Sequence, residues 1–560
     1  MKAGAYRAYA GMNGLKRAIV PLSALGASIG FGIMSRSHPG WLWGLIVTLP
    51  ILVLGLYDMT QTRWTIIRNY PVAGRLRWLF YDLRPFLRAY IVEGDEEGQP
   101  YSYEARRLVY ARAEQTSDTH PFGTELDLDA VAYTWLTHSI APGKEPEQRP
   151  RVEVGGPQCD QPYQASIFNI SAMSFGALSA AAVRAMNKGA RIGGFYQDTG
   201  EGGISPYHLE YGGDLVWEIG SGYFGCRDAQ GRFDPELFRE QAQREVVRMV
   251  EIKLSQGAKP GHGGLLPGAK VTPEIAQTRR VAEGEDCLSP RGHSAFSTPL
   301  ELLEFAARLR DLSGGKPVGI KLCIGHVHEV MALMKAMLKS GILLDYIVVD
   351  GAEGGTGAAP LELSNHVGMP LKEGLVVMRN ALVGTGLRDR VRLAASGKVF
   401  SAAGIAKSLA IGADWCNAAR AFMFSIGCIQ AQRCHTGTCP TGVTTQDPRR
   451  QHGLVVDVQA QRAANFHGRT LEALANIVAA AGLTHPGQLQ PHHLYQRVSA
   501  NRALPIDRVW HFLPEGALLE MPEKTPYAHW WRAASAESFT PSVALELVRN
   551  RAPQTNRGAL

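Results

Sequence analysis

The hydrophobic pattern near the N-terminus consists of two apolar runs, from Ala18 to Met34 and from Trp41 to Tyr57, and neither run carries a formal charge. Each run is about 17 residues long, which is the lower limit for a helix that crosses a bilayer. The segment SRSHPG between them is typical of a turn. The pattern predicts a two-helix transmembrane hairpin, with a pair of buried core helices as the alternative.

Basic residues flank both ends of this hairpin. They are Lys2, Arg7, Lys16 and Arg17 before it, and Arg63, Arg68, Arg75, Arg77, Arg84 and Arg88 after it. Because positively charged flanks stay on the cytoplasmic side, we expect both termini in the cytoplasm and the chain at the inner (cytoplasmic) membrane. A signal peptide fits less well, since there are two runs and a basic segment follows the second.

From about Pro150 onward, short apolar runs alternate with glycine-rich turns and with stretches that have apolar residues at helical spacing, as in α/β proteins. Helical spacing occurs in residues 179–190, 301–312, 330–340 and 401–413. Eight runs have the length of strands, namely 165–173, 193–199, 214–219, 247–254, 317–322, 344–349, 390–395 and 413–418. Eight strands with crossover helices predict a (β/α)8 TIM barrel.

Glycine clusters follow the predicted strands directly. They read SFGALS, TGEGG, GAKPGHGGLLPG, DGAEGGTGAAP and ASGK. In such a barrel the loops after the strands form the active site. Glycine lets the backbone approach a ligand closely and leaves amides open to phosphate. Any one cluster alone is only a turn, but together they predict a ligand site at one end of the barrel.

Composition narrows the classes of function. The chain has 560 residues, 45% of them hydrophobic, which allows a large core. The net charge of +7 is modest, and the basic residues form no stripe interleaved with aromatics, so we set nucleic-acid binding aside. Eight cysteines, most of them scattered, do not resemble a secreted disulfide framework, which favours a reducing compartment.

Three cysteines nevertheless gather in residues 428–442, CIQAQRCHTGTCPTG, as Cys428, Cys434 and Cys439. Chance spacing, disulfide pairing and metal ligation are all compatible with this array. Zinc would normally take a fourth ligand, and His435 is awkwardly placed beside Cys434 to join the same tetrahedron.

Seven stretches resemble the FMN-binding synthase domain of glutamate synthase. In the family's order they are SAMSFGALS (171–179), QDTGEGG (197–203), EIKLSQGAKPGHGGLLPGAKV (251–271), IKL (320–322), DGAEGGTGAAP (350–360), ASGKVFSAAGIAKSLAIGAD (396–414) and GCIQAQRCHTGTCPTGVTTQDP (427–448). The resemblance covers about Gln164 to Ala475. It implies an FMN-dependent barrel and an oxidoreductase that acts on the CH–NH2 group of donors, in a stand-alone, membrane-attached form.

The resemblance also implies the cofactors. Cys428, Cys434 and Cys439 would ligate a [3Fe-4S] cluster, and the chemistry agrees, because thiolates suit soft iron and three ligands fit a cluster that lacks its fourth iron. Three inert thiols are the alternative. The residues expected at FMN are Ser396, Gly397 and Lys398 near its phosphate, Ala172, Met173, Ser174 and Thr199 at the isoalloxazine edge, and Lys321 as a cation near N1 and O2.

The implied reaction is the reductive amination of 2-oxoglutarate, or a related 2-oxo acid, by ammonia and a hydride from reduced FMN. Electrons would enter through the cluster from a donor such as ferredoxin or a flavoprotein subunit. The expected site residues are Glu201, Lys321 and His262 for catalysis, and Lys253, Lys259, Lys270, Gly355 and Thr356 for the substrate. Glu201 could equally order its own glycine loop, and each lysine could be a solvated surface charge.

Some regions depart from the family. His262 stands where glutamate synthases usually carry a glutamate, and residues 288–296 replace a stretch rich in proline and histidine. We expect no amidotransferase domain and no C-terminal β-helix. The expected organisation is a hairpin (1–60), a basic connector (61–150), the barrel (151–475) and a helical extension with a tail (476–560). A membrane-attached FMN/iron–sulfur protein that transfers electrons to quinone is the main rival function, and a flavin-free barrel with a zinc knuckle is another.

Overall fold

The structure is a computed structural model that describes residues 2–146 and 148–542. The chain divides into two compact units, one ending at Tyr103 and the other beginning at Glu104. This division falls inside the predicted connector, so part of that connector belongs to each unit. The two units are considered separately below.

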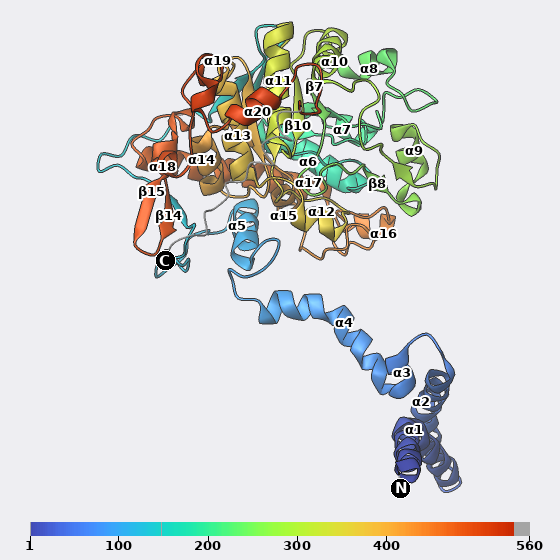
Figure 1. The fold of residues 1–560 in the computed structure, drawn as a ribbon. Coiled ribbons are helices and arrows are strands. Elements are labelled where there is room, and N and C mark those ends of the chain that lie inside the picture. The colour runs from blue at the N-terminus through green and yellow to red at the C-terminus, as the bar shows by residue number, and fades with distance from the viewer. Residues whose placement is uncertain (1, 147, 543–560) are drawn as a thin grey trace. The chain divides into compact units, whose positions relative to one another are not determined.

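The first unit begins with two long helices, α1 (Lys2–Met34) and α2 (Trp43–Thr60), joined through the 3-10 turn η1 (Pro39–Leu42) (Figure 1). They pack antiparallel, because Ser28 Oγ donates to Thr48 Oγ1 at 2.8 Å while Pro21 lies against Gly55. By length and composition, the helical stretch Pro39–Thr60 is able to cross a bilayer, whereas the apolar part of α1, Ala18–Met34, is shorter. The transmembrane hairpin therefore stays a prediction.

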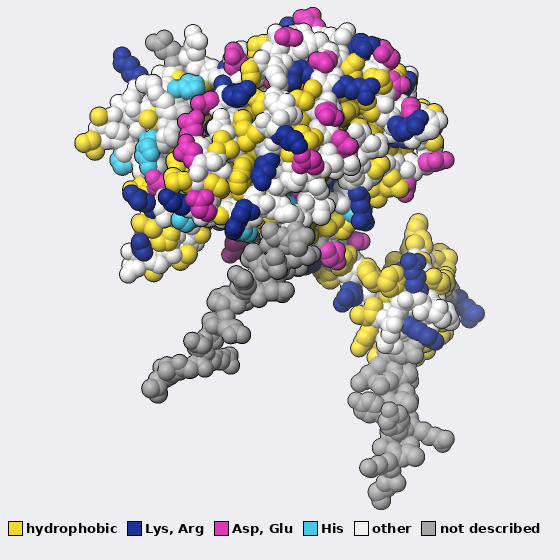
Figure 2. Space-filling view, turned by 45° about the horizontal axis from the view of Figure 1, so that its top comes forward, with side chains coloured by type: hydrophobic (Ala, Val, Ile, Leu, Met, Phe, Trp, Pro, Cys, Tyr) yellow, Lys and Arg dark blue, Asp and Glu magenta, His cyan; other side chains and the backbone are white. Residues whose placement is uncertain are grey.

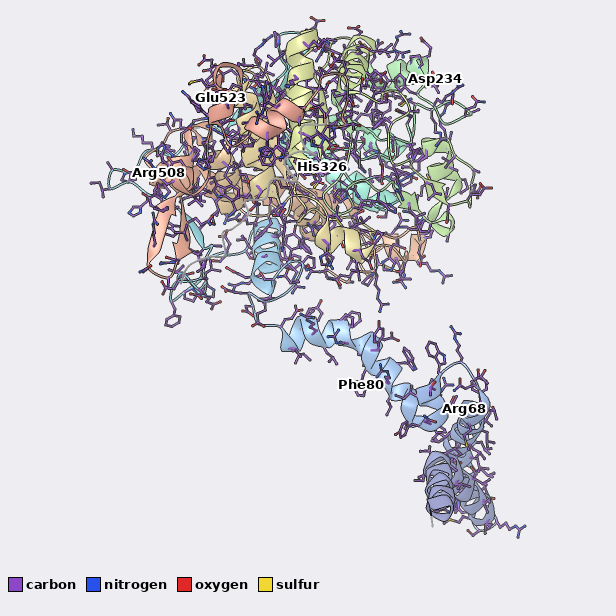
Figure 3. All side chains as sticks on the ribbon, in the orientation of Figure 1. Arg68, Phe80, Asp234, His326, Arg508 and Glu523 are labelled. Atoms are coloured by element: carbon purple, nitrogen blue, oxygen red, sulfur yellow. The ribbon has the colours of Figure 1, made fainter. Side chains whose placement is uncertain are left out.

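An ion pair joins the end of α2 to the segment that follows it. Arg75 donates to both carboxylate oxygens of the fully buried Asp58, with 2.6 Å between Nη2 and Oδ1. Beyond it, α4 (Leu76–Leu87) exposes apolar and aromatic side chains such as Leu79, Phe80 and Tyr81. Phe80 is labelled in Figure 3, and Figure 2 shows hydrophobic side chains interspersed with Lys and Arg on the described part of this unit.

The second unit is built on a closed barrel of eight parallel strands, in which each strand pairs with the next and the last pairs with the first. The strands are β4 (Phe168–Ile170), β5 (Gln197–Asp198), β6 (Leu215–Ile219), β7 (Val247–Lys253), β10 (Val318–Leu322), β11 (Tyr346–Asp350), β12 (Arg392–Ser396) and β13 (Trp415–Ala418). Every predicted strand range overlaps one of them, so the predicted (β/α)8 barrel is confirmed.

Crossover helices surround this barrel (Figure 1). The four helices expected from apolar spacing form as α6 (Ala180–Gly193), α10 (Pro299–Leu312), α11 (Val327–Ser340) and α14 (Ala402–Ile411). Local signals set their ends: Thr298 and Glu301 form a capping box at the start of α10, and Gly194 ends α6 with a left-handed backbone. The 25-residue helix α17 (Val456–Ala480) packs against α6 and α14.

The barrel interior changes from apolar to charged along the strands. Its apolar layer includes Tyr196, Val216 and Met249, all buried. Two residues further on, the same three strands carry Asp198, Glu218 and Glu251, which are buried as well. Because inward-facing positions recur every second residue, these carboxylates form the next layer, on the side where the strands end. The charged layer therefore faces the end of the barrel where active sites are built.

The segment after the barrel is not only helical. Strands β14 (Leu494–Ser499) and β15 (Arg502–Pro505) form a hairpin that pairs with β1 (Thr134–Leu136), a segment far upstream in the sequence. Further on, α20 (Ala528–Ala533) packs against α11, where Lys335 Nζ donates to Ala534 O at 2.9 Å. The predicted C-terminal extension thus adds a small sheet and helices to the second unit.

Candidate active site and cysteine loop

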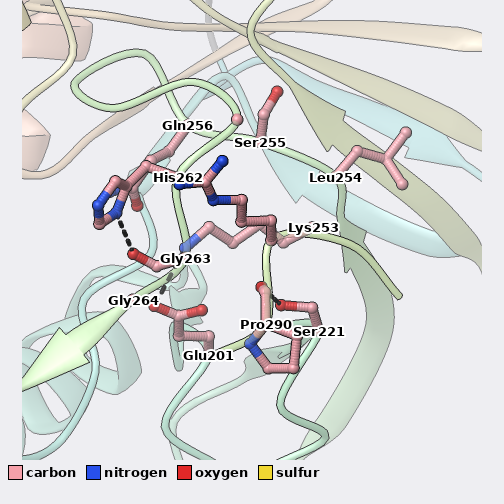
Figure 4. A pocket seen from close by; sticks show the side chains of 12 residues that line it. Glu201, Ser221, Lys253, Leu254, Ser255, Gln256, His262, Gly263, Gly264 and Pro290 are labelled. Atoms are coloured by element: carbon pink, nitrogen blue, oxygen red, sulfur yellow. Dashed lines mark hydrogen bonds and ion pairs between the residues drawn. The ribbon is translucent and has the colours of Figure 1, made fainter. Parts of the chain in front are cut away.

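An ion pair lies at the centre of the barrel mouth. Lys253, the last residue of β7, places its Nζ 3.2 Å from Oε1 of Glu201, which lies in the loop after β5. Figure 4 shows the two side chains pointing toward each other in a small pocket of ≈ 20 Å³. The residues lining this pocket are Glu201, Ser221, Lys253, Leu254, Ser255, Gln256, Gly261, His262, Gly263, Gly264, Pro290 and Arg291.

Surrounding cations keep Glu201 ionised. Burial raises the pKa of this carboxyl, but the charges of Lys253, Lys259 and Arg279 outweigh burial and lower the pKa to about 2. Lys259 is itself buried, which lowers its pKa, and the Glu201 charge opposes that lowering. Three cations therefore surround one carboxylate.

Both regions that depart from the family line this pocket. His262 is exposed, and its Nδ1 lies 2.8 Å from Gly263 O. From the segment 288–296, the Ser289 hydroxyl donates weakly to Glu201 Oε2 at 3.5 Å, and Ser221 Oγ donates to Pro290 O. His262 and the segment 288–296, the two departures noted in the sequence, thus both contribute to the pocket lining.

His293, in the same segment, contacts the backbone of Lys253. Its Nε2 lies 2.9 Å from Lys253 O, which can only accept, so Nε2 carries the proton and Nδ1 accepts from the Tyr223 hydroxyl at 3.1 Å. Burial lowers the pKa of His293 to about 4. The neutral ring therefore fixes the end of β7 that carries Lys253.

Arg279 is a site residue that the sequence did not reveal. It is the last residue of α9 (Pro273–Arg279), it is 4% exposed, and its Nη2 donates to Ser174 Oγ at 3.2 Å and to Phe175 O at 3.0 Å. Its Nε is buried and has no hydrogen-bond partner among the residues that the structure describes. A single arginine in a helix of ordinary composition gives no local signal, so only the fold brings it to Glu201.

Lys321 lies inside the charged layer of the barrel. It is 4% exposed, pairs with Glu218, and lies 3.4 Å from Glu251 Oε1. Burial and the charge of Asp198 raise the pKa of Glu251 well above its usual range, and burial raises the pKa of Asp198 too. Neighbouring carboxyls of this kind hold a proton between them. Lys321, the cation expected near the flavin, therefore lies against an acidic layer that is partly protonated.

The loops expected at FMN come together at the strand ends. Gly200, with φ +64°, lies so close to the 172–174 segment that a Cβ would be 2.6 Å from Ser174 N. Only glycine allows this approach of the TGEGG loop to the neighbourhood of Ala172 and Met173. Thr199 is fully buried, and its hydroxyl donates to Gly200 O at 3.1 Å.

The ASGK loop forms a second cationic corner. Ser396 Oγ lies 3.3 Å from Ser171 Oγ, and Gly397 turns the chain with φ +143°, where a Cβ would lie 3.2 Å from Gly351 N. Lys398 follows in a left-handed conformation, φ +58°. Burial lowers the pKa of Lys398, and the charge of Arg420 lowers it further. Two cations thus lie near each other beside glycine-rich backbone, an arrangement suited to phosphate.

Gly355 lies beside this corner and not beside the Glu201–Lys253 pair. A Cβ on Gly355 would lie 2.6 Å from Arg420 Nε, and Arg420 donates to Glu353 O. Thr356 is exposed in the same loop, before α12 (Leu361–His366). Arg420 is a second cation that the sequence did not reveal.

The three cysteines lie in the loop between α15 (Arg420–Ser425) and α16 (Pro448–Gln451) and are free thiols. Tyr110 of α5 (Tyr103–Glu114) donates its hydroxyl to Cys428 O at 2.7 Å. At its other end the loop is bound to the SFGALS segment, where Gln446 Nε2 donates to Gly176 O at 3.1 Å and to Leu178 O at 3.0 Å.

The arrangement of the three thiols is compatible with an iron–sulfur cluster. A tetrahedral zinc ion binds thiolates at about 2.3 Å, so their sulfurs lie roughly 4 Å apart. Within residues 2–146 and 148–542, the set of three ligand atoms within 4.8 Å of one another comes from Asp198, Glu218 and Glu251, not from the cysteines. A cluster with several irons holds its thiolates further apart.

Polar groups around the sulfurs point the same way. Within the described part of the chain, the buried Thr444 Oγ1 has no hydrogen-bond partner. Burial raises the pKa of Cys439, but hydrogen bonding, first of all from the Thr441 hydroxyl 3.5 Å from its sulfur, outweighs burial and lowers it, whereas burial raises the pKa of Cys428 to about 12. Thr441 thus favours the thiolate form of Cys439, which is the form that binds iron.

Lys270 lies at this loop, although the sequence grouped it with Lys253 and Lys259. Its Nζ donates to Cys434 O at 3.2 Å and to Thr444 O at 3.4 Å. Burial lowers the pKa of Lys270, and the charges of Cys434 and Cys439 oppose the lowering. Lys253 and Lys259 therefore lie near Glu201 together with Arg279, whereas Lys270, which was expected beside them, lies at the cysteine loop.

Comparisons with known proteins identify the family of this chain. A family model described as the conserved region in glutamate synthase matches residues 147–484, which is more than half of the chain. The glutamate synthase large subunit-like protein YerD of Bacillus subtilis (strain 168) is 37% identical over 510 residues, which cover 83% of this chain and 97% of YerD.

Other relatives match over a smaller share of the chain. The archaeal-type glutamate synthase (NADPH) of Thermotoga maritima is 34% identical over 56% of this chain, and the match spans 59% of that relative. Among solved structures, a flavocytochrome b2 mutant with pyruvate bound is 13% identical at a TM-score of 0.37, over 75% of this chain and 89% of that one, and so low a likeness supports no statement about this chain. The family match and the long match to YerD agree, and the chain belongs to the glutamate synthase family.

Proposed function

We propose that this protein is an FMN-dependent oxidoreductase that reductively aminates 2-oxoglutarate, or a related 2-oxo dicarboxylic acid, to the amino acid. The observation that carries the proposal is the Glu201–Lys253 pair with Lys259 and Arg279 around it, at the mouth of a barrel of this family. An imine formed from the oxo acid and ammonia would be the species reduced.

The charges in the pocket suit a dicarboxylate. Lys253, Lys259 and Arg279 supply three positive charges against the single carboxylate of Glu201. The surplus of two positive charges would be balanced by the two carboxylates of a 2-oxo dicarboxylic acid. Arginine binds a carboxylate through two parallel hydrogen bonds, and the Arg279 Nε without a partner is available for one of them.

Glu201 would act by position and charge. With a pKa lowered to about 2, it is ionised at neutral pH and is a poor proton donor. A carboxylate held there stabilises the positive charge of a protonated imine and accepts its N–H. His262 takes the place of the family's usual glutamate in the same pocket, so it would contribute to the choice of oxo acid or amine.

The chain's own groups fit both cofactors. Lys398 and Arg420 would bind the FMN phosphate, residues 172–174 and Thr199 would border the ring, and Lys321 would face its N1 and O2 side. FMN supplies the hydride for the imine carbon when it is bound, and a [3Fe-4S] cluster on Cys428, Cys434 and Cys439 supplies single electrons. A ferredoxin or flavoprotein would be the donor.

Attachment to a membrane is part of the proposal. The helical stretch Pro39–Thr60 is apolar and long enough to cross a bilayer, and the packed α1–α2 pair has basic residues on both flanks. We infer an inner-membrane location with the barrel on the cytoplasmic side. A membrane location also keeps open electron transfer to quinone as the rival function.

Anaerobic purification of the full chain in detergent tests these proposals. We expect flavin absorption, released FMN, and a paramagnetic resonance signal near g = 2 that is typical of an oxidised three-iron cluster. Glutamate should then form from 2-oxoglutarate and ammonia with a chemical or ferredoxin reductant. Quinone reduction without any response to 2-oxo acids would contradict reductive amination and support electron transfer to quinone. A colourless protein that contains zinc would contradict both functions.

A further inference from the structure

Lys270 is a buried cation without an anionic partner in the described residues. It lies in the 3-10 turn η4 (Gly268–Lys270) and is 6% exposed. Its Nζ donates to two carbonyl oxygens, Cys434 O at 3.2 Å and Thr444 O at 3.4 Å. Within residues 2–146 and 148–542, no carboxylate oxygen forms an ion pair with it. Two carbonyl dipoles do not replace the solvation of an ammonium group, and a buried charge normally has a partner of opposite sign.

The thiols of Cys434 and Cys439 are groups near Lys270 that can carry negative charge. Residues 427–446 contain neither Asp nor Glu, whereas Arg433 adds a further positive charge. Cys434 and Cys439 are the groups whose negative charge favours the charged form of Lys270. Thiolates that bind iron are anionic throughout the working cycle, so the cysteine loop would supply the missing countercharge once its cluster is in place.

We propose that Lys270 is the counter-cation of the iron–sulfur cluster, which holds the Cys434 segment in place and raises the reduction potential of the cluster. This rests on the proposed function, because it takes Cys428, Cys434 and Cys439 as ligands of that cluster. Lys270 is a positioning residue: it contacts the ligand loop and not the substrate.

The effect on potential follows from electrostatics. A cluster bound by three thiolates gains one more negative charge when it is reduced. A fixed positive charge beside it, away from water, stabilises the reduced form more than the oxidised form. Removing this charge should therefore shift the midpoint potential to a more negative value, and potentials of such clusters are known to follow local charge and hydrogen bonds.

The chain contains a matched control in Lys316. This lysine is also 6% exposed, and its Nζ also donates to two carbonyl oxygens, Ala242 O at 2.7 Å and Arg244 O at 2.8 Å. It precedes β10, at the opposite end of the strands from the cysteine loop. Lys316→Met therefore removes a buried lysine with similar contacts, but far from the sulfurs.

The experiment compares full-length wild-type holoprotein with Lys270→Met, Lys270→Arg and Lys316→Met. Iron and acid-labile sulfide per flavin are measured first, and the midpoint potential is then obtained from a redox titration followed by paramagnetic resonance. We expect Lys270→Met to shift the potential negative, or to lose iron while it keeps FMN. Lys270→Arg and Lys316→Met should both stay close to wild type.

Three results would overturn this inference: a wild-type potential and full iron in Lys270→Met, a loss in Lys270→Arg as large as in Lys270→Met, or the same change in Lys316→Met. A wild-type protein without any cluster is a different result, since it would overturn the proposed function itself. The wild-type iron content therefore separates the two failures.

Discussion

Glu201 and Lys253 form an ion pair across the mouth of the barrel, with 3.2 Å between Oε1 and Nζ. The pair joins the loop after β5 to the end of β7, two segments that are more than fifty positions apart in the sequence but meet in the barrel. Lys259 and Arg279 add positive charge to the same carboxylate.

Replacing Glu201 by glutamine tests its role in stabilising a cationic intermediate. We expect Glu201→Gln to lower kcat for amination of 2-oxoglutarate by about 100- to 1000-fold, the usual effect of removing one preorganised electrostatic group. FMN content should not change. Steady-state kinetics with ammonia gives the answer, and Glu210→Gln, which removes a surface partner of Arg184, is the control. Full activity in Glu201→Gln would rule this role out.

Replacing Cys434 by serine separates the two cofactors. Serine is a poor ligand for soft iron, so Cys434→Ser should lose the cluster signal and acid-labile sulfide while some FMN stays bound. Iron and flavin analysis of the purified variant measures both. Cys159→Ser changes a half-buried thiol at the other end of the barrel and should keep its iron. Full iron and sulfide in Cys434→Ser would contradict the ligand assignment.

The corner formed by Lys398 and Arg420 predicts a preference for the flavin phosphate. In Lys398→Met, the Kd for FMN should rise roughly 10-fold or more, since a charge-assisted hydrogen bond to phosphate is worth about 1.5–3 kcal/mol. Riboflavin, which lacks the phosphate, should bind wild type and variant alike. Flavin fluorescence titration of the deflavinated protein measures both affinities. Lys407→Met, which removes another half-buried lysine whose Nζ donates to Thr134 O, should leave both affinities unchanged.

His467 predicts a loss of stability at low pH. It is 1% exposed on α17, with 2.9 Å between its Nε2 and Ser166 Oγ, and burial lowers its pKa to about 3. In the unfolded chain the His467 ring takes up a proton near pH 6.5, whereas in the folded protein it does so only near pH 3. The contribution of the neutral ring is therefore complete above pH 6.5 and is lost progressively as the pH falls toward 3, at about 1.4 kcal/mol per unit.

Urea unfolding between pH 7 and pH 4 measures this effect. The unfolding midpoint of wild type should fall more steeply with decreasing pH than that of His467→Gln, which has no ring to titrate. Exposed His485 caps a 3-10 turn, and His485→Gln should leave the wild-type slope intact. Parallel slopes in wild type and His467→Gln would show that this ring does not set the acid sensitivity.

Most of the barrel could be predicted because its signals are local. Each strand is a short apolar run followed by glycine, and α6, α10, α11 and α14 show apolar residues at helical spacing with clear caps. The hairpin β14–β15 was missed because its partner, β1, lies far upstream and no local pattern announces their pairing.

The site was predictable only where residues lie in recognisable loops. Glu201, Lys253 and the three cysteines stand in motifs, whereas Arg279 and Arg420 join the site from ordinary segments through the fold. Lys270 shows the opposite problem: its loop was recognised, but a turn of the backbone directs its side chain to the cysteines. Sequence spacing alone does not show whether a lysine in this loop points toward the Glu201 pocket or toward the cysteines.

The charged layer inside the barrel has a consequence for how the protein folds. Lys321 comes from the second half of the barrel, on β10, while its carboxylate partners, Glu218 and Glu251, come from the first half, on β6 and β7. A first half formed alone would leave Glu218 and Glu251 without the lysine that pairs with them, and a second half formed alone would leave Lys321 without these two carboxylates. Neither half is electrostatically complete, so the barrel should close as one cooperative unit and not by the docking of two preformed halves.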